Sequence, residues 1–477
     1  MLPRFISVKI YTYVLDQINL CLPDFFYKEE AVNKSGFDFK LYLKIVEIYS
    51  HILRKIDNED EIFIEELQLK RLKNVLAAAN QTVWWKEYFK KNLIDINSIK
   101  DIRDLEKIPP VTRYKLINSP RQDFLTLPEE SEKIVWRSSG GSTTGTPFWW
   151  GLNKDLLTLN VFSRFINEFQ RSENKPDQYY DFKKNFYLQF NYPHVTPRSE
   201  FKWFSNGDYN VKSFDENIDE KLNYVSDIIK KSFPCVIRTT PTELLFLAKE
   251  VQARQWKLPI SVVSVTGQML DMSTRKFAEE TLGCKILLHY GAQEIGPLAF
   301  QCELNRDIYH LFKERAIVEI LNEEGGTVPN EQPGDITITC LDNKVMPLIR
   351  YQLGDVGILR KRKICNCGKN GQTLEMTRRA TDVIKYSDGT KKSIMPLIRN
   401  GFNKEPYLNL IRRFQVRQDK LDEIILILEV KKELTDAVKE SLVSFIHSKY
   451  EKKLNVVIQE TPAIPHEGKF KVFIPLN

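Results

Sequence analysis

The sequence predicts an α/β protein: a large N-terminal domain of layered α/β subdomains with an antiparallel β segment, then a small C-terminal α+β domain. Two observations lead to this fold class. Beyond Trp150, helical segments alternate with short β-branched runs at 236–237, 260–265 and 286–288, which is typical of α/β layers. After Glu314 the pattern changes to short strands at 316–321 and 335–340, separated by Gly- and Pro-containing turns. Such spacing indicates antiparallel sheet.

The remaining elements fit the same division. The 477 residues correspond to roughly three folding units. Residues 37–91 follow a helical pattern within an N-terminal helical region of about 1–120, because apolar side chains recur at spacings of three to five. Residues 134–136 read as a strand. The C-terminal part combines a strand pair across 387–389, a strand at 423–430, a helix at 436–449 and a final strand. We therefore expect a boundary near Arg379, with domains 1–378 and 379–477.

Composition excludes several classes of protein. Apolar residues make up 42% of the chain and charged residues 28%, which is ordinary globular composition. The net charge of +7 is too small for this length to indicate a nucleic-acid binder. No apolar run approaches the roughly 20 residues of a membrane-spanning helix, and residues 5–22 lack the pattern of a signal peptide. We expect a cytoplasmic protein; the sequence does not predict its oligomeric state.

A loop rich in Gly, Ser and Thr carries the strongest local signal. It reads Ser-Ser-Gly-Gly-Ser-Thr-Thr-Gly-Thr-Pro over 138–147. Glycines let the backbone approach phosphate oxygens closely, while amide and hydroxyl groups donate hydrogen bonds. The loop lacks the Gly-Lys-Ser/Thr of a Walker motif. A flexible linker is the alternative interpretation.

Two carboxylates follow strands or glycines in a manner typical of nucleotide sites. Glu294 lies in Tyr-Gly-Ala-Gln-Glu (290–294), directly after the apolar run 286–288, at the strand end where α/β sheets bind ligands. It could hold Mg²⁺ on a nucleotide. Asp355 follows Gly354 in the segment 347–355 and could accept hydrogen bonds from ribose hydroxyls. For each of them the alternative is an ordinary turn carboxylate.

Taken together, these segments resemble the adenylate-forming ligase superfamily. The resemblance is to its phenylacetate–CoA ligase branch, including relatives from capsule biosynthesis. It is carried by the Gly-rich loop, by YGAQEIGPLAFQC (290–302), by MPLIRYQLGD (346–355), by RATD (379–382) and by a C-terminal Gly-Lys at 468–469. Upstream, 66–91 and DLEKIPPVTRYK (104–115) are similar to that branch's N-terminal helices and linker.

The resemblance implies roles residue by residue. Phosphates would be bound by Ser142, Thr143, Thr144 and Gly145. Tyr290, with Gly291 beside it, would lie against the adenine, Asp355 would bind the ribose and Glu294 would bind Mg²⁺. Arg379 would support the nucleotide at the hinge, and Lys469 would enter from a mobile C-terminal lid. Two departures stand out: Phe148 where many members carry lysine, and Arg378 where glycine is usual.

Four residues form a candidate metal site: Cys302, His310, Cys365 and Cys367. Three thiolates and an imidazole are the ligands that tetrahedral Zn²⁺ prefers. Cys365 and Cys367 are separated by one residue rather than the common two, and four unrelated reduced side chains are the alternative. The capsule-branch resemblance favours a structural zinc, which would brace the loop that presents Glu294.

The implied activity is ATP-dependent activation of a small-molecule carboxylic acid through an acyl-adenylate. The acyl group would pass to a thiol, most commonly that of coenzyme A, or to an amine. Three alternatives remain: amide formation on an amino-sugar or amino acid, coenzyme adenylylation, and a catalytically silent scaffold of the same fold. A scaffold would have no need to keep Glu294, Asp355, Arg379 and Lys469 together.

Overall fold

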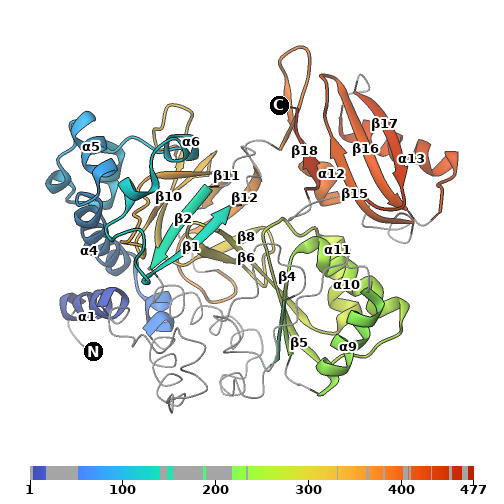
Figure 1. Ribbon diagram of the computed structural model, residues 1–477, viewed down its shortest axis with the longest axis horizontal. Helices are drawn as coiled ribbons and strands as arrows, with labels where there is room; N and C mark the ends of the chain where they lie inside the picture. Colours follow the sequence, from blue (N-terminus) through green and yellow to red (C-terminus); the bar gives the residue numbers. More distant parts are fainter. Residues whose placement is uncertain are drawn as a thin grey trace. The chain divides into compact units, whose positions relative to one another are not determined.

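The computed structural model describes residues 4–17, 52–139, 148–153, 186–189, 218–231, 235–329, 331–360, 365–379, 382–400, 407, 410–430, 432–450, 454–464 and 471–476 (Figure 1). The chain divides into two compact units. The first contains Met1–Asp181 and His289–Thr377, and the second contains Phe182–Leu288 and Arg378–Asn477. The last segment of the second unit thus starts one residue before Arg379; the division into domains 1–378 and 379–477 stays a prediction.

Helices dominate the start of the first unit. They include the α-helices α1 (Arg4–Gln17), α4 (Glu61–Ala79), α5 (Val83–Lys91) and α6 (Arg113–Ile117), with 3₁₀ turns η3 (Ile96–Ser98), η4 (Ile102–Lys107) and η5 (Arg121–Phe124). The Asp60 side chain caps α4 by accepting a hydrogen bond from the Phe63 amide at 2.8 Å. Apolar residues of α1 and α4 bury one face against each other. The predicted helical region is therefore present in the described part of 37–91.

Antiparallel pairing is found among the described strands of the first unit. β1 (Ile134–Ser139) pairs with β2 (Phe148–Asn153). A larger sheet has neighbouring strands in the order β7-β8-β12-β11-β10-β9, and the end of β6 pairs with β7. These strands are β6 (Lys285–Ala292), β7 (Gly296–Gln301), β8 (Ile308–Leu311), β9 (Ala316–Leu321), β10 (Pro333–Cys340), β11 (Tyr351–Arg360) and β12 (Thr373–Arg379). The antiparallel pairing of β9 with β10 confirms the sequence-based expectation.

The second unit contains the predicted parallel layer. β3 (Phe186–Gln189), β4 (Cys235–Thr239) and β5 (Ile260–Thr266) pair in parallel. The accompanying helices are α9 (Ile218–Lys231), α10 (Pro241–Ala253) and α11 (Met272–Leu282). Central β5 residues such as Val262, Val263 and Val265 are fully buried, as expected for a strand covered on both faces.

The C-terminal residues form a compact α+β arrangement with its own apolar core. Its sheet has the order β17-β16-β15-β18. The elements are β13 (Val383–Lys385), β14 (Lys391–Ser393), α12 (Met395–Asn400), β15 (Ile411–Arg417), β16 (Glu423–Val430), α13 (Asp436–Lys449), β17 (Asn455–Thr461) and β18 (Phe473–Ile474). Buried residues from Ile384 to Phe473 form one cluster. β16 and α13 have the predicted bounds, and the mixed α/β fold class is confirmed. Among the described helices, none is long and apolar enough to cross a membrane.

Candidate active site

Glu294 lies on the tight turn between β6 and β7, as the sequence predicts. The turn is closed by a hydrogen bond from the Ile295 amide to the Ala292 carbonyl at 3.2 Å. Gly291 is required in this hairpin because a Cβ atom there would collide with the Gly296 carbonyl. Only 7% of the Glu294 side chain is exposed, so the turn delivers a buried carboxylate.

Two side chains from distant segments face that carboxylate. The Tyr351 hydroxyl donates a hydrogen bond to Glu294 Oε1 at 3.3 Å, and Arg113 Nη1 lies 3.9 Å from the same oxygen. Burial raises the pKa of Glu294, while Arg113 and Tyr351 act to lower it. Burial, and then the neighbouring Glu294, raise the pKa of Tyr351 well above its usual value, so its hydroxyl keeps the proton that it donates.

Arg113 reaches this position because the backbone before it is fixed against β11. The Val111 amide donates to the Arg350 carbonyl at 2.8 Å, and the Gln352 amide donates to the Val111 carbonyl at 3.0 Å. Thr112 then caps α6 through its side chain, which accepts from the Lys115 amide at 3.4 Å. Arg113 is therefore the first residue of a helix that starts beside Tyr351.

Tyr290 and Asp355 lie side by side. The Tyr290 hydroxyl donates to Asp355 Oδ2 at 2.9 Å. Asp355 lies within β11 and not in a turn, so the interpretation as a turn carboxylate is wrong for this residue. β10 and β11 change register between the pairs Thr337–Gln352 and Asp335–Val356, so β11 carries extra residues there. Gly354, with φ of 79°, allows this bulge.

Several predicted site residues lie outside the described part. Ser142, Thr143, Thr144 and Gly145 fall in the gap between Ser139 and Phe148, and Lys469 falls between Ile464 and Lys471. The backbone of Arg379 ends β12, but its side chain is not described. The roles given to these residues stay predictions.

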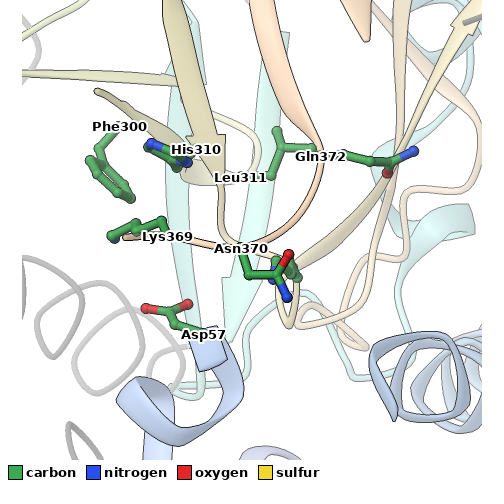
Figure 2. A pocket seen from close by; sticks show the side chains of 8 residues that line it. Asp57, Phe300, His310, Leu311, Lys369, Asn370 and Gln372 are labelled. Atoms are coloured by element: carbon green, nitrogen blue, oxygen red, sulfur yellow. The ribbon is translucent and has the colours of Figure 1, made fainter. Parts of the chain in front are cut away.

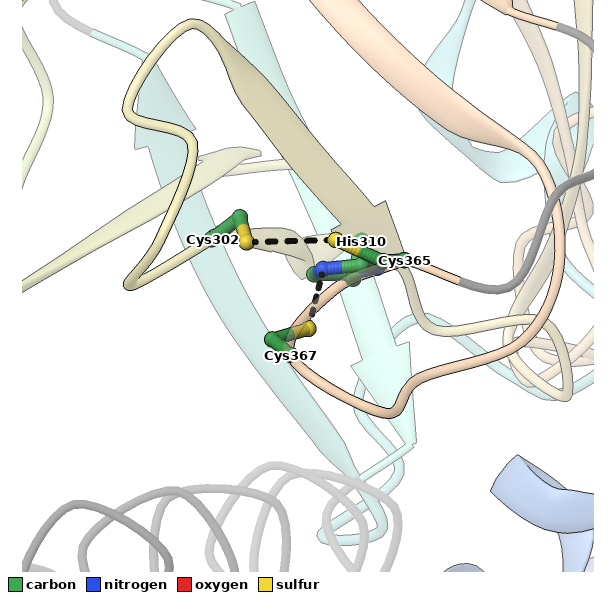
Figure 3. Close-up of side chains that lie close together, drawn as sticks. All are labelled: Cys302, His310, Cys365 and Cys367. Carbon is green, nitrogen blue, oxygen red and sulfur yellow. Dashed lines mark hydrogen bonds between the residues drawn. The ribbon is translucent and has the colours of Figure 1, made fainter.

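The four predicted metal ligands lie together in the first unit (Figure 3). Cys302 Sγ is 3.6 Å from Cys365 Sγ, and Cys367 Sγ is 3.2 Å from His310 Nε2. All four ligand atoms lie within 4.8 Å of one another. Zn–S distances of about 2.3 Å place sulfurs around a tetrahedral zinc about 3.8 Å apart, so the donor set and its spacing fit zinc.

Local backbone structure brings these ligands together. Cys302 follows β7, and its amide donates to the Ile308 carbonyl at 2.9 Å as the chain turns toward β8, which carries His310. In the second segment, the Cys365 amide donates to the Lys369 carbonyl at 2.8 Å, and Gly368 adopts φ of 83°. Despite the short spacing, this turn brings Cys365 and Cys367 to the same cluster.

A small pocket beside this cluster has a mixed polar and aromatic lining (Figure 2). The lining residues are Asp57, Phe300, His310, Leu311, Lys313, Lys369, Asn370 and Gln372. Phe300 stacks on His310 with ring centroids 5.3 Å apart, and Lys369 Nζ lies 3.5 Å from the Phe300 centroid. These contacts fix the His310 ring. The pocket contains none of the residues predicted to bind nucleotide.

Arg113 and Tyr351 were not predicted from the sequence as partners of Glu294. Both lie inside the segments that carried the family resemblance, DLEKIPPVTRYK and MPLIRYQLGD. Periodicity gives no signal for either residue, because they lie 238 positions apart in the sequence. Their segments meet only in the folded protein, at the backbone bridge between Val111 and Tyr351.

The fold is similar to that of a solved acyl-CoA ligase. The structure matches that of 2-hydroxyisobutyryl-CoA ligase in complex with 2-HIB-AMP with a TM-score of 0.64 and 13% sequence identity, over 86% of this chain and 89% of that one. A second complex of that ligase, with 2-HIB-AMP and CoA, matches with a TM-score of 0.55 and 15% identity, over 88% of this chain and 91% of that one.

Among curated proteins, the chain is similar to phenylacetate-coenzyme A ligases. It is 24% identical to that of Thermus thermophilus over 322 residues, 64% of this chain and 68% of the relative. It is 23% identical to that of Escherichia coli over 309 residues, 61% of this chain and 66% of the relative. No family model matches the chain. The similarity to the curated phenylacetate-coenzyme A ligases confirms the predicted resemblance to the phenylacetate–CoA ligase branch.

Proposed function

We propose that the protein is an ATP-dependent ligase that activates a small carboxylic acid as an acyl-adenylate and transfers the acyl group to coenzyme A. The observation that carries the proposal is the meeting of three separate segments in one unit: the Glu294 turn, β11 with Tyr351 and Asp355, and the start of α6 with Arg113. The curated relatives, phenylacetate-coenzyme A ligases, support the proposal.

In the first half-reaction, an oxygen of the substrate carboxylate attacks the α-phosphorus of ATP. The bond between the α-phosphorus and its bridging oxygen breaks, and pyrophosphate leaves. Glu294 would hold the Mg²⁺ that offsets phosphate charge, a task that suits a buried carboxylate. Tyr290 would lie against the adenine with Gly291 beside it, and Asp355, oriented by the Tyr290 hydroxyl, would accept hydrogen bonds from the ribose.

The remaining contacts come from the residues outside the described part. Ser142, Thr143, Thr144 and Gly145 would donate hydrogen bonds to the phosphates. Lys469 would stabilise the negative charge of the carboxylate and α-phosphate, with Arg379 supporting the nucleotide. In the second half-reaction, the acceptor sulfur would attack the acyl carbon and AMP would leave.

We also propose that Cys302, His310, Cys365 and Cys367 hold one structural Zn²⁺. The support is the donor set and its spacing. Four protein ligands leave no position for substrate, so the ion would join the end of β7 to the Cys365 turn and take no part in the reaction. A cytoplasmic location stays a prediction.

The test is ATP–pyrophosphate exchange with the purified protein, screened across aryl, fatty and amino acids. We expect exchange that depends on one class of acid and on Mg²⁺. Supplying coenzyme A, amino-sugars or amino acids as acceptor then separates the thioester ligase from the amide ligase. A coenzyme that is itself adenylylated would support the third alternative. Binding of acid or ATP with no exchange under any condition would support the scaffold instead.

A further inference from the structure

A buried arginine, Arg315, donates hydrogen bonds to the backbone that follows Glu294. Arg315 Nη2 donates to the Ile295 carbonyl at 2.9 Å, and Arg315 Nη1 donates to the Pro297 carbonyl. These carbonyls belong to the first and third residues after Glu294 along the chain. Arg315 is itself fixed by its backbone, because its amide donates to the Phe312 carbonyl and its carbonyl accepts from the Leu341 amide.

Asp342 and a second arginine complete a buried ionic cluster. Arg315 Nε lies 2.7 Å from Asp342 Oδ2, and Arg71 Nη2 lies 2.9 Å from Asp342 Oδ1. Arg71 also donates to the Glu314 carbonyl. The side chains of Arg71, Asp342 and Arg315 are 1%, 0% and 4% exposed. The cluster therefore links helix α4 to the backbone that follows Glu294.

A buried ionic cluster of this kind needs an explanation other than stability. Removing charges from water costs free energy that their mutual attraction often fails to recover, and apolar replacements are frequently as stable. What an arginine supplies is a rigid set of donors with a fixed geometry. Here the Arg315 guanidinium donates to the Ile295 and Pro297 carbonyls, and its bond to the Asp342 carboxylate fixes its orientation.

We propose that Arg315, oriented by Asp342 and Arg71, is a positioning residue that sets the Glu294 carboxylate for the Mg²⁺ of MgATP. It acts through the Ile295 and Pro297 carbonyls. The inference rests on the proposed function and adds helix α4 to the elements on which nucleotide binding depends. Residues that orient a metal ligand without touching the metal typically change metal affinity about ten- to a hundredfold when replaced.

The experiment compares Arg315→Met, Arg315→Lys and Arg71→Met with Arg413→Lys as the matched control. Arg413 pairs with Glu429 in the C-terminal sheet at 2.7 Å, with 13% and 7% of the side chains exposed, and it belongs to the second unit, whereas the Glu294 turn belongs to the first. Two quantities are measured: the Mg²⁺ concentration for half-maximal pyrophosphate exchange, and hydrogen exchange of the amides in 292–298 without nucleotide.

We expect Arg315→Met to raise the half-maximal Mg²⁺ concentration at least tenfold and to speed exchange of the turn amides at least tenfold. Arg315→Lys should restore part of both, and Arg71→Met should give a smaller change in the same direction. Arg413→Lys should lower the melting temperature and leave both quantities at the wild-type value.

The proposal is overturned if the Arg315 variants lower the melting temperature but leave the turn amides and the Mg²⁺ dependence unchanged. If Arg315→Met does not fold, Arg315→Lys and Arg71→Met decide by the same criteria. If the wild-type protein shows no pyrophosphate exchange, the proposed function is contradicted, and so is the role of Arg315 in Mg²⁺ binding. Hydrogen exchange would still decide whether Arg315 orders the turn.

Discussion

At the scale of single residues, the surroundings of Glu294 act in opposite directions on the pKa of its carboxyl group. Burial raises the pKa of its carboxyl group, whereas Arg113 at 3.9 Å and the Tyr351 hydroxyl favour the charged form. A carboxylate in such surroundings gains from a nearby cation, because few waters compensate its charge. These surroundings suit the Mg²⁺-binding role proposed for Glu294.

Replacing Glu294 by Gln keeps its shape and removes its charge. We expect Glu294→Gln to slow acid-dependent pyrophosphate exchange at least about a hundredfold, the size typical of a lost electrostatic contact in an active site. Raised Mg²⁺ should restore part of the rate. Steady-state exchange kinetics at several Mg²⁺ concentrations check this.

Glu303, which is exposed in the loop after β7, provides the control, and Glu303→Gln should behave as wild type. Unchanged kinetics in both variants would make Glu294 an ordinary turn residue.

A second residue-scale prediction concerns the pairing of Arg113 with Glu294. Their side chains are 16% and 7% exposed, so each replacement should destabilise the protein by leaving the other group without its partner. Urea unfolding of Arg113→Met, Glu294→Gln and the double variant should give a coupling of about 1 to 3 kcal/mol, the upper part of the range for interacting neighbours. Effects that add independently would show that the two side chains do not interact in solution.

At the scale of elements, the sequence predicted several of the strands and helices but not how they pack together. β16 was predictable because it is a nearly continuous apolar run, and α13 because its apolar residues recur at helical spacing. The placement of Asp355 was not, since a bulge in β11 depends on its pairing with β10. The same holds for Arg113, Arg315 and Asp342, whose partners are far along the chain. Short-range pattern identifies the carboxylates, and only tertiary structure shows what surrounds them.

The cluster of Cys302, His310, Cys365 and Cys367 belongs to this scale because it brings together the end of β7, strand β8 and the Cys365 turn. β7 runs from the Glu294 turn directly to Cys302, so an ion bound there would fix one end of the strand whose other end presents the carboxylate. We expect about one zinc per chain in protein purified without chelators. Removing the zinc should lower the melting temperature and weaken MgATP binding together, measured by metal analysis, thermal unfolding and calorimetry.

A cysteine outside the cluster controls for loss of a thiol as such. Cys284 lies before β6, away from the four ligands in the sequence, and is partly buried. Cys284→Ala should keep the zinc content, whereas Cys302→Ser should lose it. Protein that contains no zinc and shows no thermal shift when zinc is added would contradict the metal assignment.

At the scale of the whole molecule, the C-terminal residues have a core of their own, built from β13 to β18 and helices α12 and α13. A segment with its own core can move as a body, which is what the predicted domain 379–477 requires. The family resemblance implies that this body presents Lys469 in one half-reaction and withdraws it in the other. The kinetics of the two half-reactions can therefore test a domain motion.

If Lys469 enters the site only for adenylation, its ammonium group stabilises the carboxylate and α-phosphate in that step and is absent when the acceptor attacks. Lys469→Ala should slow acid-dependent pyrophosphate exchange about a hundred- to a thousandfold, yet leave transfer from a supplied acyl-adenylate largely intact.

Lys471 is the matched control: its side chain is exposed, and its carbonyl accepts a hydrogen bond from Gln415 Nε2 at 2.8 Å. The described strand β18 begins only at Phe473, so Lys471 is not part of a regular strand. Lys471→Ala should slow pyrophosphate exchange much less than Lys469→Ala does, and should also leave acyl transfer largely intact. Equal loss of both half-reactions in Lys469→Ala, or exchange at the wild-type rate, would contradict a lysine that serves adenylation alone.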